Sequence, residues 1–437
     1  MFDLQKFGMK FGLEGMRSIL EKLDNPHKKL KMVHLAGTNG KGSVGVMLQS
    51  LLSEAGYRVG FYTSPHLITF RERIKIGPEM ISEDEVLTLS QKVWAATDPD
   101  SPPTFFEFVT ALAFLYFASK GLDLAIIETG LGGRLDSTNV IEPLLSAITN
   151  VTLEHTDHLG GTVPEIAAEK AGIIKAGVPV AGGRLSPEGR EVIEARAKEL
   201  GSPFWLLDRD FSVEHVSQDT QGRLTVNYRR RGSAGYDQLA LGLAGAHQAD
   251  NAAVAVTLAL ALAEKGFSLS EDQLRQGLKK AVWPGRAETY PAGHWPPEGA
   301  RASAPLMLDG AHNPAGAQAL AEMLKGLDRR RLHVVVGVMA DKDIGGVLGP
   351  ILAQADCIYL TRPVFSRAAS PELLREKIVA AFGEPKAPTS LHPGIPQALR
   401  AAADEARDGD LVLLTGSLFT VGECRAYLEG APEVESN

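Results

Sequence analysis

The chain has 437 residues, more than one ordinary core accommodates, and this length predicts two or three domains. Its 45 Lys and Arg residues against 53 Asp and Glu residues give a formal charge of −8, which argues against nonspecific binding to nucleic acid or to an anionic membrane. The two cysteines, Cys357 and Cys424, lack the spacing of a metal site and favour a reduced, cytoplasmic protein.

The N-terminal residues mix charged and apolar side chains, so we expect no signal peptide. The apolar runs 108–118 and 252–263 are shorter than the ~20 residues that a membrane span requires, and we read them as buried helices. A predicted helical segment within residues 1–30 leads directly into the apolar run 32–36.

A glycine-rich turn follows that run and precedes a predicted helix over 44–55, whose apolar residues recur at the helical period. Glycines allow a sharp turn that aims successive N–H groups at one point, where the helix adds its positive dipole end. The pattern predicts a phosphate loop, with Lys41 against the outer phosphates and Ser43 near a magnesium ion. The loop consists of Gly37, Thr38, Asn39, Gly40, Lys41, Gly42 and Ser43.

The loop departs from the G-x-x-x-x-G-K-[ST] pattern at two positions. Leu35 stands where the first glycine belongs, and Gly42 stands where the hydroxyl belongs. Taken alone, the stretch also fits an ordinary strand-to-helix turn whose glycines serve backbone geometry.

Strands alternate with helices through the first half of the chain, a pattern that predicts a doubly wound parallel sheet. The predicted strands are 57–62, 122–127, 144–149 and 178–181, and helices are predicted over 104–119 and 165–174. Polar residues follow these strands at their carboxyl ends, where open α/β sheets bind ligands. Glu128 ends one strand before three glycines and suits a metal ligand. His155 and His158 lack the cysteines of a structural zinc site, and hydrogen bonding within a polar loop is their alternative role.

Short antiparallel strands are predicted within 200–240, and prolines and glycines over 290–305 have linker composition. The α/β pattern then restarts. We therefore expect an α/β protein in which residues 1–288 form a P-loop-type domain with a doubly wound parallel sheet. Residues 298–437 are expected to form a smaller Rossmann-like α/β domain.

Seven ordered motifs resemble those of the folylpolyglutamate synthase/dihydrofolate synthase family, a branch of the Mur ligase superfamily. They begin at Gly37, Thr63, Glu128, Glu154, Glu169, Pro284 and Asp309 and span nearly the whole chain. Cell-wall Mur ligases are the nearest alternative, but they carry a preceding UDP-sugar domain, and we expect the 36 residues ahead of Gly37 to be too few for one. A P-loop kinase without ligase chemistry is the other alternative, and a kinase would not need the second loop at 309–314.

The resemblance implies an ATP-dependent ligase. The carboxylate of dihydropteroate or of a reduced folate would be phosphorylated, and the amine of L-glutamate would attack the acyl phosphate. It implies one or two Mg²⁺ ions held by Ser43, Ser64, Glu128, His155 and Lys170, the lysine as a carbamate. It also implies ATP contacts from the loop and from Asn251, Arg286 and Asp309, whose ordinary alternatives are a helix cap, a solvated arginine and a turn aspartate.

The catalytic residues implied by the resemblance are Lys41, His155, Lys170 and His312. His312 and Asn313 are expected to bind the incoming glutamate. Phe106, Glu107 and Asp136, with residues 11–14, are expected at the pterin pocket, although an aromatic residue on an apolar helix is usually core. The partners implied are small molecules bound by a monomer, with neither nucleic acid nor membrane. The sequence does not choose between dihydropteroate and a folate that already carries glutamate.

Overall fold

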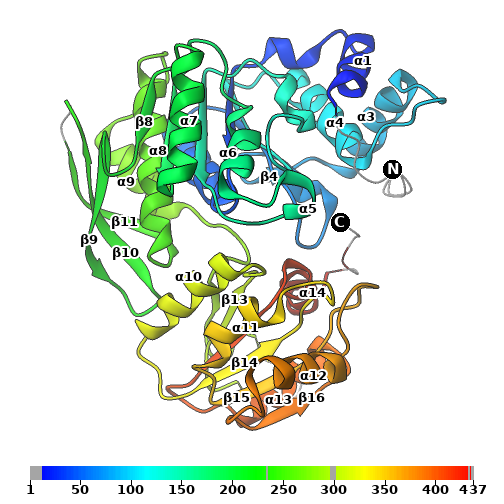
Figure 1. Ribbon diagram of the computed structural model, residues 1–437, viewed down its shortest axis with the longest axis vertical. Coiled ribbons are helices and arrows are strands. Elements are labelled where there is room, and N and C mark those ends of the chain that lie inside the picture. The colour runs from blue at the N-terminus through cyan, green and yellow to red at the C-terminus, as the bar shows by residue number, and fades with distance from the viewer. Residues whose placement is uncertain (1–11, 233–234, 296–301, 432–433, 435–437) are drawn as a thin grey trace.

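The computed structural model describes residues 12–232, 235–295, 302–431 and 434. Two α/β units lie one above the other along the long axis, with the N-terminal unit at the top of Figure 1 and the C-terminal unit, in yellow to red, below it. The expected α/β class is confirmed. No helix in the described part of the chain is long and apolar enough to cross a membrane.

The N-terminal unit is built on an eight-stranded sheet in the order β4-β3-β2-β5-β1-β6-β7-β8. Its strands are β1 (Met32–Ala36), β2 (Val59–Tyr62), β3 (Ile74–Ile76), β4 (Glu79–Met80), β5 (Leu124–Glu128), β6 (Leu145–Asn150), β7 (Val180–Arg184) and β8 (Phe204–Leu206). All neighbours from β2 to β8 pair in parallel, as predicted. The antiparallel pairs at the β3–β4 edge have no clear sequence signal, because these strands are only three and two residues long.

Helices cover both faces of this sheet because its central strands are apolar on both sides. Residues alternate along β1, so that Val33 and Leu35 face one layer and Met32 faces the other. The layer against Val33 contains α2 (Lys41–Glu54), α8 (His247–Ala263) and α9 (Glu271–Lys280). The opposite layer contains α1 (Glu14–Lys22), α3 (Glu83–Ala96), α4 (Phe105–Ser119), α6 (Val163–Ala171) and α7 (Pro187–Glu199).

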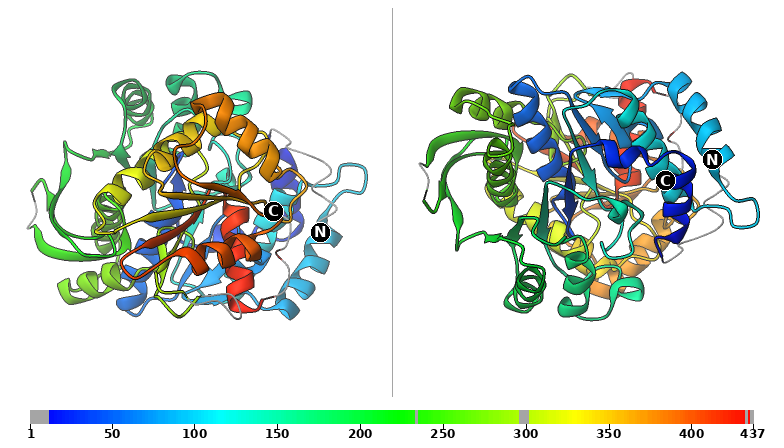
Figure 2. Two further views of the ribbon diagram at one scale, coloured as in Figure 1. Left: turned by 90° about the horizontal axis from the view of Figure 1, so that it is seen from below. Right: turned by 90° about the horizontal axis from the view of Figure 1, so that it is seen from above.

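A three-stranded antiparallel sheet packs on α8, in the order β11-β10-β9. Its strands are β9 (Phe211–Gln218), β10 (Arg223–Arg230) and β11 (Tyr236–Ala244), of which β9 and β10 lie within the region predicted to hold short antiparallel strands. The strand at Phe204–Leu206 in the same region is instead β8, which pairs in parallel with β7 in the first sheet. Leu224, Val226 and Tyr228 join its inner face to the core around α2 and α8. This sheet lies at one side of the molecule in all views (Figures 1 and 2).

The C-terminal unit is a six-stranded sheet in the order β12-β13-β17-β14-β15-β16, parallel except at β12. The strands are β12 (Glu288–Tyr290), β13 (Leu306–Asp309), β14 (Leu332–Val336), β15 (Cys357–Leu360), β16 (Thr389–Leu391) and β17 (Leu411–Thr415). Figure 2 shows helices on both faces. They are α10 (Pro314–Lys325), α11 (Ile344–Leu352), α12 (Pro371–Phe382), α13 (Ile395–Glu405) and α14 (Leu418–Glu429).

The chain passes from the first sheet to the second around Gly285, whose φ is +71°. The strand at Glu288–Tyr290 pairs with β13 and so lies with the second sheet, although its residues fall at the predicted domain boundary and linker. The division into 1–288 and 298–437 stays a prediction. Residues 1–11, which include Phe11 of the expected pterin pocket, lie outside the described residues.

Candidate active site

One cleft of about 900 Å³ lies between the carboxyl ends of the two parallel sheets. Residues after β1, β5 and β6 line it from above, and residues after β13 and β17 line it from below. Most of the predicted site residues meet here: Gly37, Thr38, Asn39, Gly40, Lys41, Gly42, Ser43, Ser64, Glu128, His155, Lys170, Asn251, Arg286, Asp309 and His312.

The phosphate loop is held by its neighbours in a conformation that requires glycine. Gly40 is the residue before α2 and has a φ of +84°, and a side chain there would collide with Asn251. The Asn39 N–H donates to Asn150 Oδ1 at 2.8 Å, which ties the loop to the end of β6. The strand, turn and helix predicted from the sequence are therefore all present.

The glycine at position 42, where the phosphate-loop pattern has Ser or Thr, has a steric cause. Gly42 lies against the indole of Trp283, and a Cβ at this position would approach the ring to within 2.7 Å. That separation is shorter than real Cβ contacts, so a Ser or Thr would displace the ring. Ser43 therefore carries the only hydroxyl beside Lys41 in the loop's first helical turn.

Lys41 and Glu128 form the charged centre of the cleft. The Lys41 ammonium donates to the Gly37 carbonyl at 2.9 Å and lies 3.9 Å from Glu128 Oε1. Burial raises the pKa of Glu128, and the Lys41 charge opposes that change. The Thr63 hydroxyl donates to the other Glu128 oxygen. This carboxylate and the cleft-lining hydroxyls of Ser43 and Ser64 are hard oxygen donors, the set that suits Mg²⁺.

His155 and Lys170 line the cleft beside this centre. His155 has a φ of +52° and immediately precedes α5 (Thr156–Leu159), and burial lowers its pKa. Lys170 projects from α6 and is 3% exposed. Burial, followed by the repulsion of Lys41, lowers the pKa of Lys170 to about 7. A large share of this amine is therefore neutral at neutral pH.

The lower wall of the cleft comes from the loop after β13. Asp309 accepts hydrogen bonds from the backbone N–H groups of Ala287 and Ala311, at 2.9 and 2.8 Å. Its pKa is raised by burial, against the charge of Arg286. His312 Nδ1 lies 2.7 Å from the Gly310 carbonyl, so Nδ1 carries the hydrogen and Nε2 keeps a lone pair. Burial lowers the pKa of His312, which favours this neutral form.

Asn313 joins the two walls, a role that the sequence did not suggest. Its Nδ2 donates to Glu154 Oε1 at 2.8 Å and to Asn39 Oδ1 at 3.0 Å. Its Oδ1 accepts from the Gly316 N–H and caps α10. Burial would raise the pKa of Glu154, but the Asn313 hydrogen bond and nearby positive charge, that of Lys41 included, outweigh it and hold that pKa below its usual range.

Three residues expected at the pterin pocket lie behind the cleft lining. The Glu107 carboxylate accepts from the Thr104 N–H at 2.8 Å and completes the cap of α4. Asp136 accepts from the N–H groups of Gly130 and Leu131, both at 2.9 Å, and the Phe106 ring packs against Gly130. Phe106 and Asp136 therefore shape the second glycine loop, which itself lines the cleft. Direct contact of Phe106, Glu107 or Asp136 with a substrate stays a prediction.

Several polar and charged residues of the cleft were missed. Some adjoin predicted positions, and the motifs around those positions were the available signal. They are Thr63 beside Ser64, Glu154 beside His155 and Asp250 beside Asn251. Others have no local signal, because only the fold brings them to the cleft. They include Lys75 on β3, Arg184 on β7, and Lys342 and Arg367 in loops.

The sequence and the fold match known families over both units. The protein-family model described as "Mur ligase middle domain" matches residues 35–259, and the family model described as "Mur ligase, glutamate ligase domain" matches residues 299–418. The chain belongs to the Mur ligase family, and within it to the group of folylpolyglutamate and dihydrofolate synthases. It is therefore an ATP-dependent ligase that forms an amide bond.

The particular relatives agree with this placement. The chain is 36% identical to the dihydrofolate synthase/folylpolyglutamate synthase of Bacillus subtilis, over 97% of this chain and 96% of the relative. The structure of Escherichia coli FolC in complex with DHPP and ADP has a TM-score of 0.84 at 30% identity, covering 97% of this chain and 94% of that one. A bifunctional folylpolyglutamate synthase/dihydrofolate synthase with Mn, AMPPNP and L-glutamate bound has a TM-score of 0.83 at 32% identity, covering 98% and 97%.

Proposed function

We propose that this ligase joins L-glutamate to the carboxylate of dihydropteroate or of a reduced folate and converts ATP to ADP and phosphate. The observation that carries the proposal is the composition of the cleft. Its upper wall holds a phosphate loop and oxygen donors, and its lower wall holds a neutral histidine. Phosphorylation of an acid and attack by an amine can therefore take place in the same cleft. The solved relatives that bind DHPP, ADP and L-glutamate support the choice of substrates.

The upper wall is suited to the first chemical step. The backbone N–H groups of the loop and the Lys41 ammonium bind the outer phosphates of ATP and offset the charge that moves during transfer. The substrate carboxylate attacks the γ-phosphorus, the bond to the β-phosphate oxygen breaks, and ADP leaves. We assign Asn251, Arg286 and Asp309 to holding the rest of the nucleotide.

We assign a metal site to Ser43, Ser64, Glu128 and His155, with Lys170 as a carbamate. The oxygen donors fit Mg²⁺, and the burial of Lys170 together with its neutral amine suits reaction with CO₂. A bound Mg²⁺ would neutralise phosphate oxygens as charge develops on them. A manganese ion in a solved relative supports a metal site in this family.

The lower wall is suited to the second step. The glutamate amine attacks the carbonyl carbon of the acyl phosphate, an amide bond forms, and inorganic phosphate leaves. We assign His312 Nε2 to accepting a proton from the incoming amine, because Nδ1 already donates to Gly310. The link from Asn313 to Glu154 and Asn39 closes the cleft around the reactive intermediate and limits its hydrolysis.

Phosphate release from ATP tests the proposal. We expect release only when a pterin or folate acid and L-glutamate are both present, with mass spectrometry showing a product one glutamate heavier. Offering dihydropteroate and a reduced folate separately decides between dihydrofolate synthase and folylpolyglutamate synthase activity. Phosphate release at the same rate with and without glutamate would contradict the ligase assignment. The monomeric state and the cytoplasmic location stay predictions, the first open to light scattering.

A further inference from the structure

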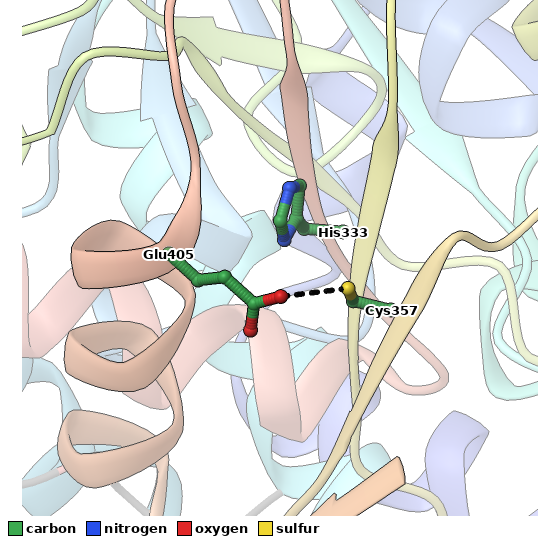
Figure 3. Close-up of side chains that lie close together, drawn as sticks. All are labelled: His333, Cys357 and Glu405. Atoms are coloured by element: carbon green, nitrogen blue, oxygen red, sulfur yellow. Dashed lines mark hydrogen bonds between the residues drawn. The ribbon is translucent and has the colours of Figure 1, made fainter. Parts of the chain in front are cut away.

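A second cluster of reactive side chains lies in the C-terminal unit, remote from the cleft. His333 on β14 and Cys357 on β15 are paired neighbours in the parallel register, and Glu405 ends α13 above them. Ligand atoms of all three lie within 4.8 Å of one another. Figure 3 shows the Glu405 carboxylate directed at the Cys357 sulfur, where the Sγ–Oε1 distance is 3.1 Å. None of the three lines the cleft.

The histidine of this cluster is oriented by a carboxylate. His333 Nε2 lies 3.3 Å from Asp410 Oδ2, and because a carboxylate only accepts, Nε2 carries the hydrogen. Asp410 is itself held by the Arg330 guanidinium at 3.0 Å and by the Arg407 N–H at 2.9 Å. The lone pair of His333 is therefore on Nδ1, the nitrogen on the side of Tyr359. A carboxylate behind a histidine is the arrangement that metal-bound histidines use.

We propose that His333 Nδ1, Cys357 Sγ and a Glu405 carboxylate oxygen bind one divalent cation of the zinc class. A thiolate, an imidazole and a carboxylate are the donors that zinc prefers, and three protein ligands leave a fourth position for water. The Glu405 side chain is 47% exposed, so solvent reaches this side of the cluster. His333 and Cys357 are almost fully buried, and their strands fix them side by side without a metal.

Binding requires three local changes. The Tyr359 hydroxyl, 3.0 Å from His333 Nδ1 and 2.7 Å from Glu405 Oε2, turns away and releases both side chains. The Cys357 thiol, whose pKa burial and Glu405 raise to about 11, gives up its proton to solvent as the metal–sulfur bond forms. The Arg331 guanidinium, 2.8 Å from Cys357 Sγ and 3.5 Å from a Glu405 oxygen, occupies the cation's position and moves into solvent. Its side chain is 37% exposed, so this movement meets little obstruction. Arg331 and the metal therefore compete for the same two side chains, Cys357 and Glu405.

The location indicates a structural role. The cluster lies at the amino ends of β14 and β15, the sheet edge opposite the one that supplies the cleft. A metal here would join two strands to α13 and would stabilise the C-terminal unit through binding to the folded state alone. It would take no part in the ligase reaction.

Cobalt titration of the full chain, without ATP or magnesium, tests the site directly. We expect one equivalent of Co²⁺ to give a thiolate-to-cobalt charge-transfer band, which Zn²⁺ then abolishes. Cys357→Ser should eliminate the band, whereas Cys424→Ser should retain it, since Cys424 is buried elsewhere on α14. The cleft has no cysteine, so cobalt bound there would not produce this band.

Substitutions of the ligand Glu405 and of its neighbour Arg331 should change Zn²⁺ affinity in opposite directions. Both side chains are partly exposed, so neither substitution should prevent folding. Glu405→Gln should weaken Zn²⁺ binding at least tenfold, and Arg331→Gln should strengthen it. Asp410→Asn should weaken it about 10–100-fold through the histidine, with Asp408→Asn as the matched control. No charge-transfer band, a band that survives Cys357→Ser, or equal Zn²⁺ affinity in the Glu405 and Arg331 variants would each overturn the proposal.

Discussion

Asn313 Nδ2 lies 2.8 Å from Glu154 Oε1, and this hydrogen bond joins the loop after β13 to the loop after β6. The same amide nitrogen reaches Asn39 in the phosphate loop at 3.0 Å. One side chain of the lower wall thus contacts both the nucleotide loop and the polar loop that carries His155. Closure of the cleft and the state of the phosphate loop are mechanically connected through it.

Asn313→Ser separates this connection from the capping of α10. Serine retains an oxygen for the Gly316 N–H but has no amide to reach Asn39 and Glu154. We expect kcat to fall and uncoupled ATP hydrolysis to rise, because the cleft closes less firmly over the acyl phosphate. Asn313→Ala should do the same and also lose about 1 kcal/mol of stability with the cap. Phosphate release compared with amide formation measures the coupling, and tight coupling in both variants would contradict the prediction.

Lys170 should make stability depend on pH in CO₂-free buffer. Its pKa is about 7 in the folded protein against an ordinary value of 10.5, so between these values the unfolded chain holds more protons. The free energy of unfolding contributed by this group therefore rises with pH across that window. Lys170→Met has no charged amine to bury, so this variant should be more stable than the wild type. The difference in free energy of unfolding should be largest below pH 7 and should vanish toward pH 10.5. Denaturant titrations at several pH values measure this difference, with the exposed Lys198→Met as control.

Bicarbonate provides an independent test of the same lysine. If CO₂ reacts with the neutral amine of the folded protein, bicarbonate should raise the Tm of the wild type but not of Lys170→Met. Native mass spectrometry should show an added mass of one CO₂. Full ligase activity in Lys170→Ala would contradict a metal-binding role for the carbamate.

The packing of Gly42 against Trp283 predicts a compensating pair of substitutions. Gly42→Ala should cost about 1–3 kcal/mol by overpacking and should weaken ADP binding, because the added methyl collides with the indole. Trp283→Leu should relieve that cost, so the double variant is more stable than additivity predicts. Thermal unfolding and ADP titration of the four proteins measure the coupling. Strict additivity would show that the ring moves aside freely.

Asp136 should affect substrate binding through the second glycine loop. Asp136→Ala removes the acceptor of the Gly130 and Leu131 N–H groups, and we expect a stability loss of about 1–3 kcal/mol. The KM for the acid substrate should rise while ADP affinity stays unchanged, because the phosphate loop lies on another strand. Asp136→Asn retains one side-chain oxygen and should be milder. Equal losses of ADP and acid binding would indicate general unfolding instead.

Periodicity and strand-end chemistry predicted the two parallel sheets and three parts of the cleft, and the family resemblance supplied the other predicted site residues. The loop from Gly37 to Ser43, Glu128 and His155 could be placed because each follows a buried strand, and carboxyl ends of parallel strands share one edge. The edge strands β3 and β4 were missed because two or three residues carry no readable period. Glu107 and Asp136 both accept hydrogen bonds from backbone N–H groups, a role that the sequence does not distinguish from contact with a ligand, so their contact with a substrate stays a prediction. Lys342 and Arg367 depend on long-range packing, which no local pattern records.

Gly285 and Arg286 lie where the chain crosses from one sheet to the other, and that position makes them a pivot. The Gly310 N–H donates to the Gly285 carbonyl at 2.9 Å, which ties the loop of Asp309 to this crossing. A rotation of the C-terminal unit about the crossing would therefore move Asp309 little and would move the loops after β14 and β15, which carry Lys342 and Arg367, much more. Nucleotide contacts made near the pivot would survive opening of the cleft, so ATP should be able to bind the open enzyme.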